Sequence, residues 1–206
     1  AIGGVFVDLS LNNASGMGFD TLVSIEHARG GQYTDLLYGD ASSNLLQGAG
    51  GNDTLEGNDG NDTLEGAEGN DSVLGGEGFD TLSGGEGDDV LHGGADIDMA
   101  DYSSATGAVQ VSLDAGTATG AAGADTLQFI ENLLGSQHAD TLTGDFNNNY
   151  LAGNGGNDTL LGGDGNDDLN GGDGDDSLSG GTGGGLLRGG AGNDTLDGGA
   201  DQDRVS

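Results

Sequence analysis

Some residue types that ordinary globular domains use are absent or scarce in this chain of 206 residues. It contains no cysteine, proline or tryptophan, and only 3 lysine and arginine residues together. The lack of cysteine excludes disulfide bonds and thiol chemistry. The scarcity of basic residues argues against nucleic acid and anionic membranes as partners, because both are bound through basic patches. No apolar run reaches the roughly 18 residues that a membrane-spanning helix needs, so no membrane insertion is expected.

Acidic residues and glycine dominate instead. Asp and Glu number 36, which gives a formal net charge of −33, and Gly numbers 47. Only 4% of the residues are aromatic. Such a composition usually indicates disorder, because the chain repels itself and has little apolar surface to bury. A strict internal period overrides that interpretation, because low-complexity sequence does not keep a register.

The period is nine residues and is clearest in residues 48–92. This stretch divides into five nonapeptides, with Gly at positions 1 and 4, Asp at position 6, and Leu or Val at position 8. An internal repeat of this kind predicts a solenoid. Positions 1 to 6 are rich in glycine and predict a turn. Positions 7 to 9 alternate polar, apolar and polar residues, which predicts a three-residue strand with its position-8 side chain pointing inward.

One turn and one short strand cannot bury an apolar face alone, but stacked copies can. Two nonapeptides would form one flattened coil, and residues two nonapeptides apart would become neighbours in a parallel ladder about 4.8 Å apart. The predicted fold is therefore all-β, a parallel β-roll with two nonapeptides per coil and a thin core. All the position-8 residues expected in that core are apolar: Leu37, Leu46, Leu55, Leu64, Val73, Leu82, Leu91, Ala100, Leu142, Leu151, Leu160, Leu169, Leu178, Leu187, Leu196 and Val205.

A second, longer repeat divides the chain into two similar halves. The tripeptide Asp-Thr-Leu at residues 20–22 returns 105 residues later at residues 125–127. We therefore expect two tandem modules, residues 1–103 and 104–206. Each module is expected to have a short N-terminal capping or linker segment with a strand, followed by eight nonapeptides: residues 1–29 and 30–101 in the first, residues 104–134 and 135–206 in the second.

The position-6 carboxylates would stack in columns along the turns and repel one another. The turns would also expose backbone carbonyls that no ladder satisfies. Calcium removes both problems, because it takes about six to eight oxygen ligands and accepts carboxylates and carbonyls together. We therefore predict calcium ions between the turns of successive coils. The predicted ligands are the position-6 carboxylates Asp35, Asp53, Asp62, Asp71, Asp80, Asp89, Asp98, Asp140, Asp158, Asp167, Asp176, Asp194 and Asp203, with turn carbonyls such as those of Gly48, Gly57, Gly66, Gly75, Gly84, Gly153, Gly162 and Gly171.

The nonapeptide resembles the RTX, or hemolysin-type, calcium-binding repeat G-G-x-G-x-D-x-U-x, in which U is a large apolar residue. The resemblance covers residues 30–101 and 135–206. It implies a right-handed parallel β-roll in a secreted bacterial protein. It also implies that the chain leaves the cell through type I secretion machinery and folds when it meets extracellular calcium.

Departures from the pattern predict weak sites. Gly185 lacks the carboxylate that sites with Asp167 and Asp203 would share, so fewer ions are expected in the second module than in the first. Other residues replace the position-4 glycine in the first turns of each module, so the first site on each side is expected to be weak. The weaker candidate ligands are Glu26, Asn44, Glu131 and Asn149.

No catalytic constellation is found, because His27, His92 and His138 are scattered and a flat solenoid face offers no deep pocket. The fragment is therefore predicted not to be an enzyme. The resemblance suggests a secretion and folding module of a larger enzyme, such as a serralysin-type protease, an RTX lipase or a mannuronan epimerase. The alternative is a repeat stalk of a large adhesin or surface-layer protein. Anionic polysaccharide or other cell-surface components are further candidate partners, bridged through calcium.

Overall fold

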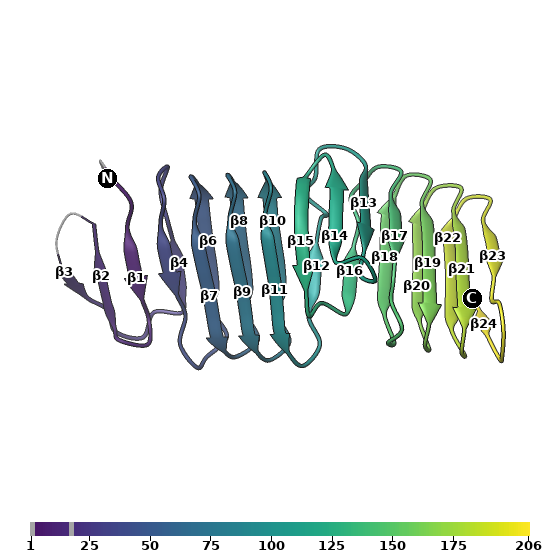
Figure 1. Cartoon of the computed structure of the whole chain (residues 1–206), viewed down its shortest axis with the longest axis horizontal. Coiled ribbons are helices and arrows are strands. Elements are labelled where there is room, and N and C mark those ends of the chain that lie inside the picture. The colour runs from purple at the N-terminus through teal and green to yellow at the C-terminus, as the bar shows by residue number, and fades with distance from the viewer. Residues whose placement is uncertain (1–2, 17–18) are drawn as a thin grey trace. The chain divides into compact units, whose positions relative to one another are not determined.

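The computed structural model describes residues 3–16 and 19–206, and every regular element in these residues is a β-strand (Figure 1). The all-β prediction is therefore confirmed. None of the described residues forms a helix long and apolar enough to cross a bilayer. The contacts divide the chain into two compact units, Ala1–Ala100 with Gly123–Ile130, and Asp101–Ala122 with Glu131–Ser206.

The first unit is built from short strands that alternate between two sheets. They are β1 (Phe6–Asp8), β2 (Asn13–Ser15), β3 (Phe19–Thr21), β4 (His27–Arg29), β5 (Leu36–Tyr38), β6 (Leu45–Gly50), β7 (Thr54–Asp59), β8 (Thr63–Glu68), β9 (Ser72–Glu77), β10 (Thr81–Glu86), β11 (Val90–Ala95), β12 (Met99–Asp101) and β15 (Gly123–Gln128). One sheet runs in the order β15-β11-β9-β7-β5-β1-β2-β3, and the other in the order β12-β10-β8-β6-β4.

The second unit repeats this arrangement. Its strands are β13 (Val109–Ser112), β14 (Thr117–Gly120), β16 (Asn132–Leu134), β17 (Thr141–Thr143), β18 (Tyr150–Gly155), β19 (Thr159–Asp164), β20 (Asp168–Asp173), β21 (Ser177–Thr182), β22 (Leu186–Ala191), β23 (Thr195–Asp197) and β24 (Arg204–Val205). One sheet runs in the order β23-β21-β19-β17-β13-β14, and the other in the order β24-β22-β20-β18-β16.

Parallel pairing joins residues one coil apart. In the first unit Leu37 lies beside Leu55, and Leu55 beside Val73. In the second unit Leu160 pairs with Leu178 in the same register. Each coil therefore contains two nonapeptides, as the period predicts, and the apolar side chains stack on one another along each sheet.

The strands are longer than the prediction of three residues. In the regular coils they span six residues and continue through positions 1 to 3 of the next nonapeptide, as in β7 and β9. The prediction was wrong because these glycine-rich positions still pair in register, Ala49 with Ala67 and Gly50 with Glu68. The chain bends there through a positive φ at position 2, 82° at Ala49 and 83° at Ala67.

All the position-8 side chains except the last two are buried in the core, as predicted, together with apolar residues of the capping segments such as Val109, Val111 and Leu133. Leu46, Leu64 and Leu169 are fully buried. Leu196 is only partly buried and Val205 is 68% exposed, because β23 and β24 are the terminal strands of their sheets. A position-8 side chain is covered only when a coil lies on each side of it.

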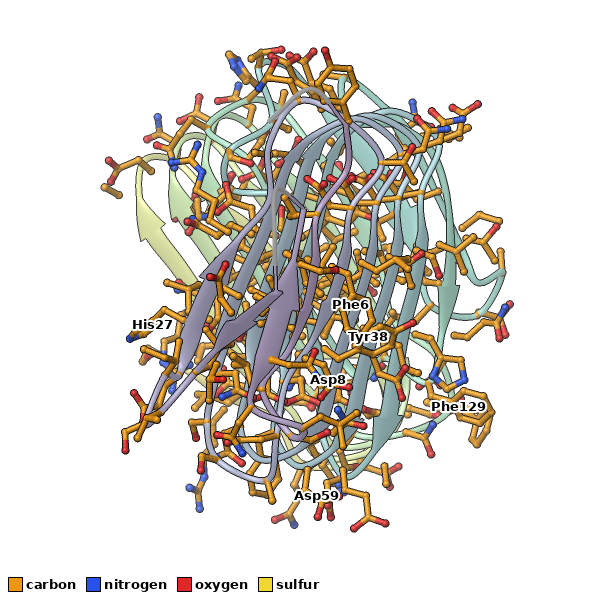
Figure 2. All side chains as sticks on the ribbon, turned by 90° about the vertical axis from the view of Figure 1, so that its left-hand side faces the viewer. Phe6, Asp8, His27, Tyr38, Asp59 and Phe129 are labelled. Carbon is orange, nitrogen blue, oxygen red and sulfur yellow. The ribbon has the colours of Figure 1, made fainter. Side chains whose placement is uncertain are left out.

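Each array of coils begins on an antiparallel hairpin. β1 pairs with β2 antiparallel and with β5 parallel, and β13 pairs in the same two ways with β14 and β17. The rings of Phe6 and Tyr38 lie side by side across β1 and β5, with centroids 5.8 Å apart (Figure 2). The hairpin therefore covers the first coil of its array and supplies the strand on which β5 or β17 is laid.

Ala67 and Gly69 in one turn both have a positive φ, but only at Gly69 would an added Cβ collide with the adjacent coil, which gives a test. Gly69 has a φ of 132°, and an added Cβ would collide with the carbonyl oxygen of Gly51 in the adjacent coil. We expect Gly69→Ala to destabilise the folded roll by at least about 2 kcal/mol, because the strained φ and the collision add. Ala67→Gly is the matched control, since glycine relieves the positive φ of Ala67. Denaturant midpoints in calcium should fall for Gly69→Ala alone; equal midpoints would contradict this account of the turn.

Candidate metal centres

The position-6 side chains lie in the turns, at the point where each turn enters a strand. Of the predicted aspartates, Asp194 and Asp203 in the last coil are half-buried. Of the weaker candidates, Glu131 is half-buried and Glu26 is exposed. The remaining predicted position-6 residues are at most 4% exposed: Asp35, Asn44, Asp53, Asp62, Asp71, Asp80, Asp89, Asp98, Asp140, Asn149, Asp158, Asp167 and Asp176. Carboxylates buried in this way need partners, because an isolated charge away from water is costly.

One oxygen of each carboxylate joins two coils. The backbone N–H of Asp53 donates to Oδ1 of Asp71 at 2.7 Å, and the N–H of Asp71 donates to Oδ1 of Asp89 at 2.7 Å. The same bond joins Asp158 to Asp176 at 2.8 Å in the second unit. The columns that the sequence predicts therefore exist, and backbone donors of the preceding coil hold their Oδ1 atoms.

The second oxygen of the inner carboxylates has no such donor. Among the described residues it is buried and without a hydrogen-bond partner in Asp53, Asp62, Asp71, Asp80, Asp89, Asp158, Asp167 and Asp176. A buried carboxylate oxygen left unpaired costs free energy that a bound cation would remove.

The position-1 glycines show where such a cation would fit. A Cβ built on Gly48 would lie closer than 3.0 Å both to Oδ2 of Asp53 and to the carbonyl oxygen of Gly66, one coil further on. The equivalent point at Gly153 is equally close to Oδ2 of Asp158 and to the carbonyl of Gly171. Position 1 must be glycine because any side chain would fill the space where these two oxygens meet.

The donor set at these turns fits a hard cation. In residues 3–16 and 19–206, no group of three His, Cys, Asp or Glu side chains converges as a metal site. Backbone carbonyls must therefore supplement one carboxylate oxygen at each turn. Calcium accepts such an all-oxygen set, whereas zinc prefers nitrogen and sulfur ligands.

Position-5 side chains, by contrast, are used for another purpose. Oδ1 of Asn52 accepts the N–H of Asn70 at 3.2 Å, and Oδ1 of Asn70 accepts the N–H of Asp88 at 3.2 Å. These exposed side chains form a ladder along the outside of the turns. Any contribution of position 5 to a metal site would therefore come from its backbone carbonyl.

The first turns of each array differ from the inner ones. In the first unit Oδ1 of Asn44 accepts the N–H of Asp40, and in the second unit Oδ1 of Asn149 accepts the N–H of Asp145. Both oxygens of Asp140 accept protein hydrogen bonds, from Val109 and from Ser136. These entry turns satisfy their own polar groups.

The coil around Gly185 lacks a carboxylate, as the sequence indicates. Oδ1 of Asp203 accepts the N–H of Gly185 at 2.9 Å, so the bridge between coils is kept. The oxygen cradle is incomplete, however. The atom nearest to the added Cβ of Gly180 is the carbonyl oxygen of Gly198, and no carboxylate oxygen is among the three nearest atoms.

Asp125 is a further member of the column formed by Asp53, Asp71 and Asp89, and it was not among the predicted ligands. Its Oδ1 accepts the N–H of Asp89 at 3.0 Å, although the two residues are 36 apart in the sequence, and the side chain is 3% exposed. The signal was the tripeptide Asp125-Thr126-Leu127, which matches positions 6 to 8 of a nonapeptide. The nonapeptide register places Glu131 at position 6 instead and hides this match.

Burial shifts the acidity of the unpaired carboxylates. Burial raises the pKa of Asp53, Asp62 and Asp158 to about 6, although the amide hydrogen bond from the preceding coil opposes the shift. Burial together with the charges of Asp125, Asp71 and Asp88 raises the pKa of Asp89 to about 7. Burial also raises the pKa of four further carboxyls, those of Asp71, Asp80, Asp167 and Asp176.

The fold and the turns define a repeat protein of the parallel β-solenoid class. Comparison with protein families matches the RTX calcium-binding nonapeptide repeat (4 copies) to residues 29–64, 65–100, 134–169, 143–178, 152–187 and 179–206. The chain therefore belongs to the RTX calcium-binding repeat family, whose members bind calcium, and the expected resemblance is confirmed.

Other comparisons are less informative. None of the curated proteins matches the chain. Among solved structures, the extracellular lipase LipA from Serratia marcescens matches with 22% sequence identity and a TM-score of 0.25. The match covers 79% of this chain and 32% of that lipase, so the chain spans about a third of the lipase's length.

The raised pKa values predict how pH acts on the metal-free chain. Folding takes up protons between the unfolded pKa of 3.8 and the folded values of about 6 to 7. Stability without calcium should therefore rise as the pH falls from about 7 to about 5 and be lost as the pH rises again. Calcium competes with these protons, so its apparent affinity should fall over the same range. Circular dichroism in chelator checks the first statement; a strand signal independent of pH would contradict it.

Gly185 offers a test of the metal sites. An added Cβ would meet the carbonyl oxygen of Asp167 at 3.1 Å, so the turn needs to give only slightly. We expect Gly185→Asp to raise the number of calcium ions bound by at least one, because it restores the missing carboxylate. Gly185→Ala, which adds the Cβ without the charge, should leave the number unchanged. Calorimetric titration measures it, and equal stoichiometry in the two variants would reject the predicted sites around Gly185.

Proposed function

We propose that this chain is a calcium-operated folding module of a secreted bacterial protein. Without calcium, 36 acidic residues and the unpaired buried oxygens oppose folding, and the chain stays extended. With calcium at the turns, the carboxylates are neutralised and the coils stack. The observation that carries the proposal is the set of buried Oδ2 atoms that meet a glycine carbonyl of the next coil instead of a donor.

The residues that would hold calcium are the inner position-6 aspartates and the position-1 carbonyls. Asp71 illustrates their work: Oδ1 accepts an amide from the preceding coil, and Oδ2 faces the carbonyl of Gly84 in the following coil. When bound, calcium supplies the positive charge that this oxygen pair lacks. Binding is expected to be cooperative, because each inner aspartate touches two neighbouring coils.

The distribution of unpaired oxygens supports more sites in the first module than in the second. Within the described residues, Asp53, Asp62, Asp71, Asp80 and Asp89 belong to the first unit. The set in the second unit is smaller and consists of Asp158, Asp167 and Asp176. The boundary between the proposed modules at residues 103 and 104 remains a prediction from the 105-residue repeat.

The proposed biological role is a secretion and folding module attached to a larger protein. Calcium sites in extracellular modules have dissociation constants of about 10⁻⁴–10⁻³ M. The calcium concentration in the cytosol is too low to fill such sites, whereas the extracellular concentration is sufficient. The chain would therefore pass type I secretion machinery unfolded and fold outside. The module itself would be non-catalytic, and any activity would belong to another domain.

A second role, a repeat stalk in an adhesin or surface-layer protein, is favoured by one observation. The chain repeats itself after 105 residues, and both units consist of the same stacked coils. Tandem modules of this kind suit a spacer, because each coil contacts mainly its neighbours. The two roles share the calcium switch and differ in the domains that the module joins.

A calcium titration with a matched pair of variants tests the proposed switch. Circular dichroism in chelator should show an unfolded chain, and added calcium should produce strand signal with a steep midpoint. Asp71→Asn should raise the midpoint severalfold and make it less steep, because it removes a buried charge at the centre of a column. Glu68→Gln removes the same charge from an exposed side chain and should have little effect. A strand signal unchanged by chelator, or equal shifts in both variants, would refute the proposal.

A further inference from the structure

Two neighbouring hollows lie on the outer face of the second unit, and they share Thr143. The first has a volume of about 230 Å³ and lies over β13, β14 and β17. The second has a volume of about 380 Å³ and lies over the turn that follows β17, where Phe146 and Asp164 line it. The shared threonine joins the two hollows into one groove.

The first hollow is a patch of hydroxyl and amide side chains on three paired strands. Strand pairing arranges them in two rows, Thr119, Gln110 and Thr141 in one and Thr117, Ser112 and Thr143 in the other. Both rows face outward, because Val111 lies between them in β13 and is buried. Each row therefore presents, at intervals of about 4.8 Å, three groups that can both donate and accept hydrogen bonds.

The second hollow has a floor of backbone and an aromatic ring beside it. Gly163 and Gly181 pair in adjacent strands, so no side chain rises from the floor. Phe146 is 73% exposed. The hydroxyl of Thr182 donates to Oδ1 of Asp164. The hollow therefore combines the face of a phenyl ring with polar groups whose orientation is fixed by a hydrogen bond.

The first unit has different residues at the equivalent places. In the 105-residue repeat, Phe146 corresponds to Ala41. Across β1 and β5, where the second unit has its hydroxyl rows, the first unit has the rings of Phe6 and Tyr38 side by side (Figure 2). Both units nevertheless stack their coils in the same way. The stacking of coils therefore does not require the groove, and another role has to account for its residues.

A saccharide has the chemistry that matches this groove. The hydroxyl groups of a sugar both donate and accept hydrogen bonds, as Thr, Ser and Gln side chains do, and a carboxylate accepts them. The C–H face of a sugar ring is apolar and can pack on an exposed aromatic ring. A compact apolar ligand would need a deep apolar pocket instead. The groove is therefore suited to a short run of sugar rings.

The charges around the groove select an uncharged saccharide. The charged residues of the second hollow are Asp114, Asp145 and Asp164. Both oxygens of Asp145 already accept hydrogen bonds from Asn147. Within the described part of the chain, neither of these hollows is lined by lysine or arginine. An anionic polysaccharide would be repelled here, because like charges at short range disfavour binding.

We propose that the groove binds an uncharged oligosaccharide. One sugar ring would stack on Phe146, with its hydroxyls bonded by Asp164 and Thr143. The following rings would lie along the hydroxyl rows of β17, β13 and β14. The second unit would thereby hold the secreted protein on a neutral polysaccharide. This role goes beyond the calcium-operated folding proposed above and requires only that the roll is folded.

Calorimetric titration of the whole chain in saturating calcium tests the site. The probes are the uncharged cellohexaose, maltohexaose and chitohexaose, with hexagalacturonate as the anionic comparison. At least one uncharged probe should bind with a dissociation constant of about 1 mM or below, and hexagalacturonate should bind at least about tenfold more weakly. Phe146→Ala should weaken the binding of the uncharged probe at least about tenfold, because the stacking surface is lost.

The matched control is Phe79→Ala, which removes an exposed ring from a turn of the first unit and should leave the affinity unchanged. Three results would overturn the proposal: no binding of any uncharged probe, binding of hexagalacturonate as tight as that of the best uncharged probe, or equal losses in the two variants. If circular dichroism shows that the chain is folded in calcium, such results refute the saccharide site alone. A chain that stays unfolded in calcium would refute both this proposal and the calcium switch.

Amide chemical shifts provide a second measurement, which locates the bound sugar. Those of Gly163 and Gly181 should move when the uncharged probe is added, because both residues line the floor of the second hollow. Gly76 is the equivalent of Gly181 in the first unit, and its shift should stay constant. Shift changes confined to the first unit would place the sugar elsewhere and contradict the proposed groove.

Discussion

The structure depends on one electrostatic constraint, the burial of carboxylate oxygens against backbone carbonyls. In each inner turn Oδ2 of an aspartate and the carbonyl of a glycine one coil away converge on the same small space, as at Gly66 with Asp71 and Gly84. Two oxygens with partial or full negative charge cannot remain there unless a proton or a cation joins them. A proton or a cation such as calcium would each solve this problem, and the proton is lost as the pH rises through the raised pKa values.

The same constraint explains why each array starts on turns of different composition. The amide of Asn58 donates to the carbonyl of Gly39 at 3.0 Å, and that of Asn154 donates to the carbonyl of Gly135 at 2.7 Å. In the entry turns, side-chain amides therefore bond position-1 glycine carbonyls. In the inner turns, the equivalent carbonyls face Oδ2 of an aspartate. The polar groups of the entry turns are thus bonded within the protein, and the next coil is laid on a surface whose hydrogen bonds are already made.

Much of this architecture could be predicted from the sequence, because a period of nine with one invariant apolar position leaves a single way to bury that position. The core, the pairing of residues one coil apart and the columns of aspartates follow from it. The six-residue strands do not, since glycine at positions 1 to 3 indicates a turn even when its peptide groups pair. Asp125 was missed because its place in the column depends on a chain excursion, residues 101–122, that no periodicity encodes.

The coupling between coils has a directional consequence. Each inner aspartate binds the amide of the coil before it through Oδ1 and faces the carbonyl of the coil after it through Oδ2, as Asp71 does with Asp53 and Gly84. A coil therefore gains its full set of partners only when both neighbours are present, and the ends of an array are its weakest points. The hairpin relieves this weakness at the start of each array, and in the first unit β15 relieves it at the end by pairing with β11. The last coil of the second unit has no such cover within the described chain, which is why its leucine and valine lie open although they occupy core positions.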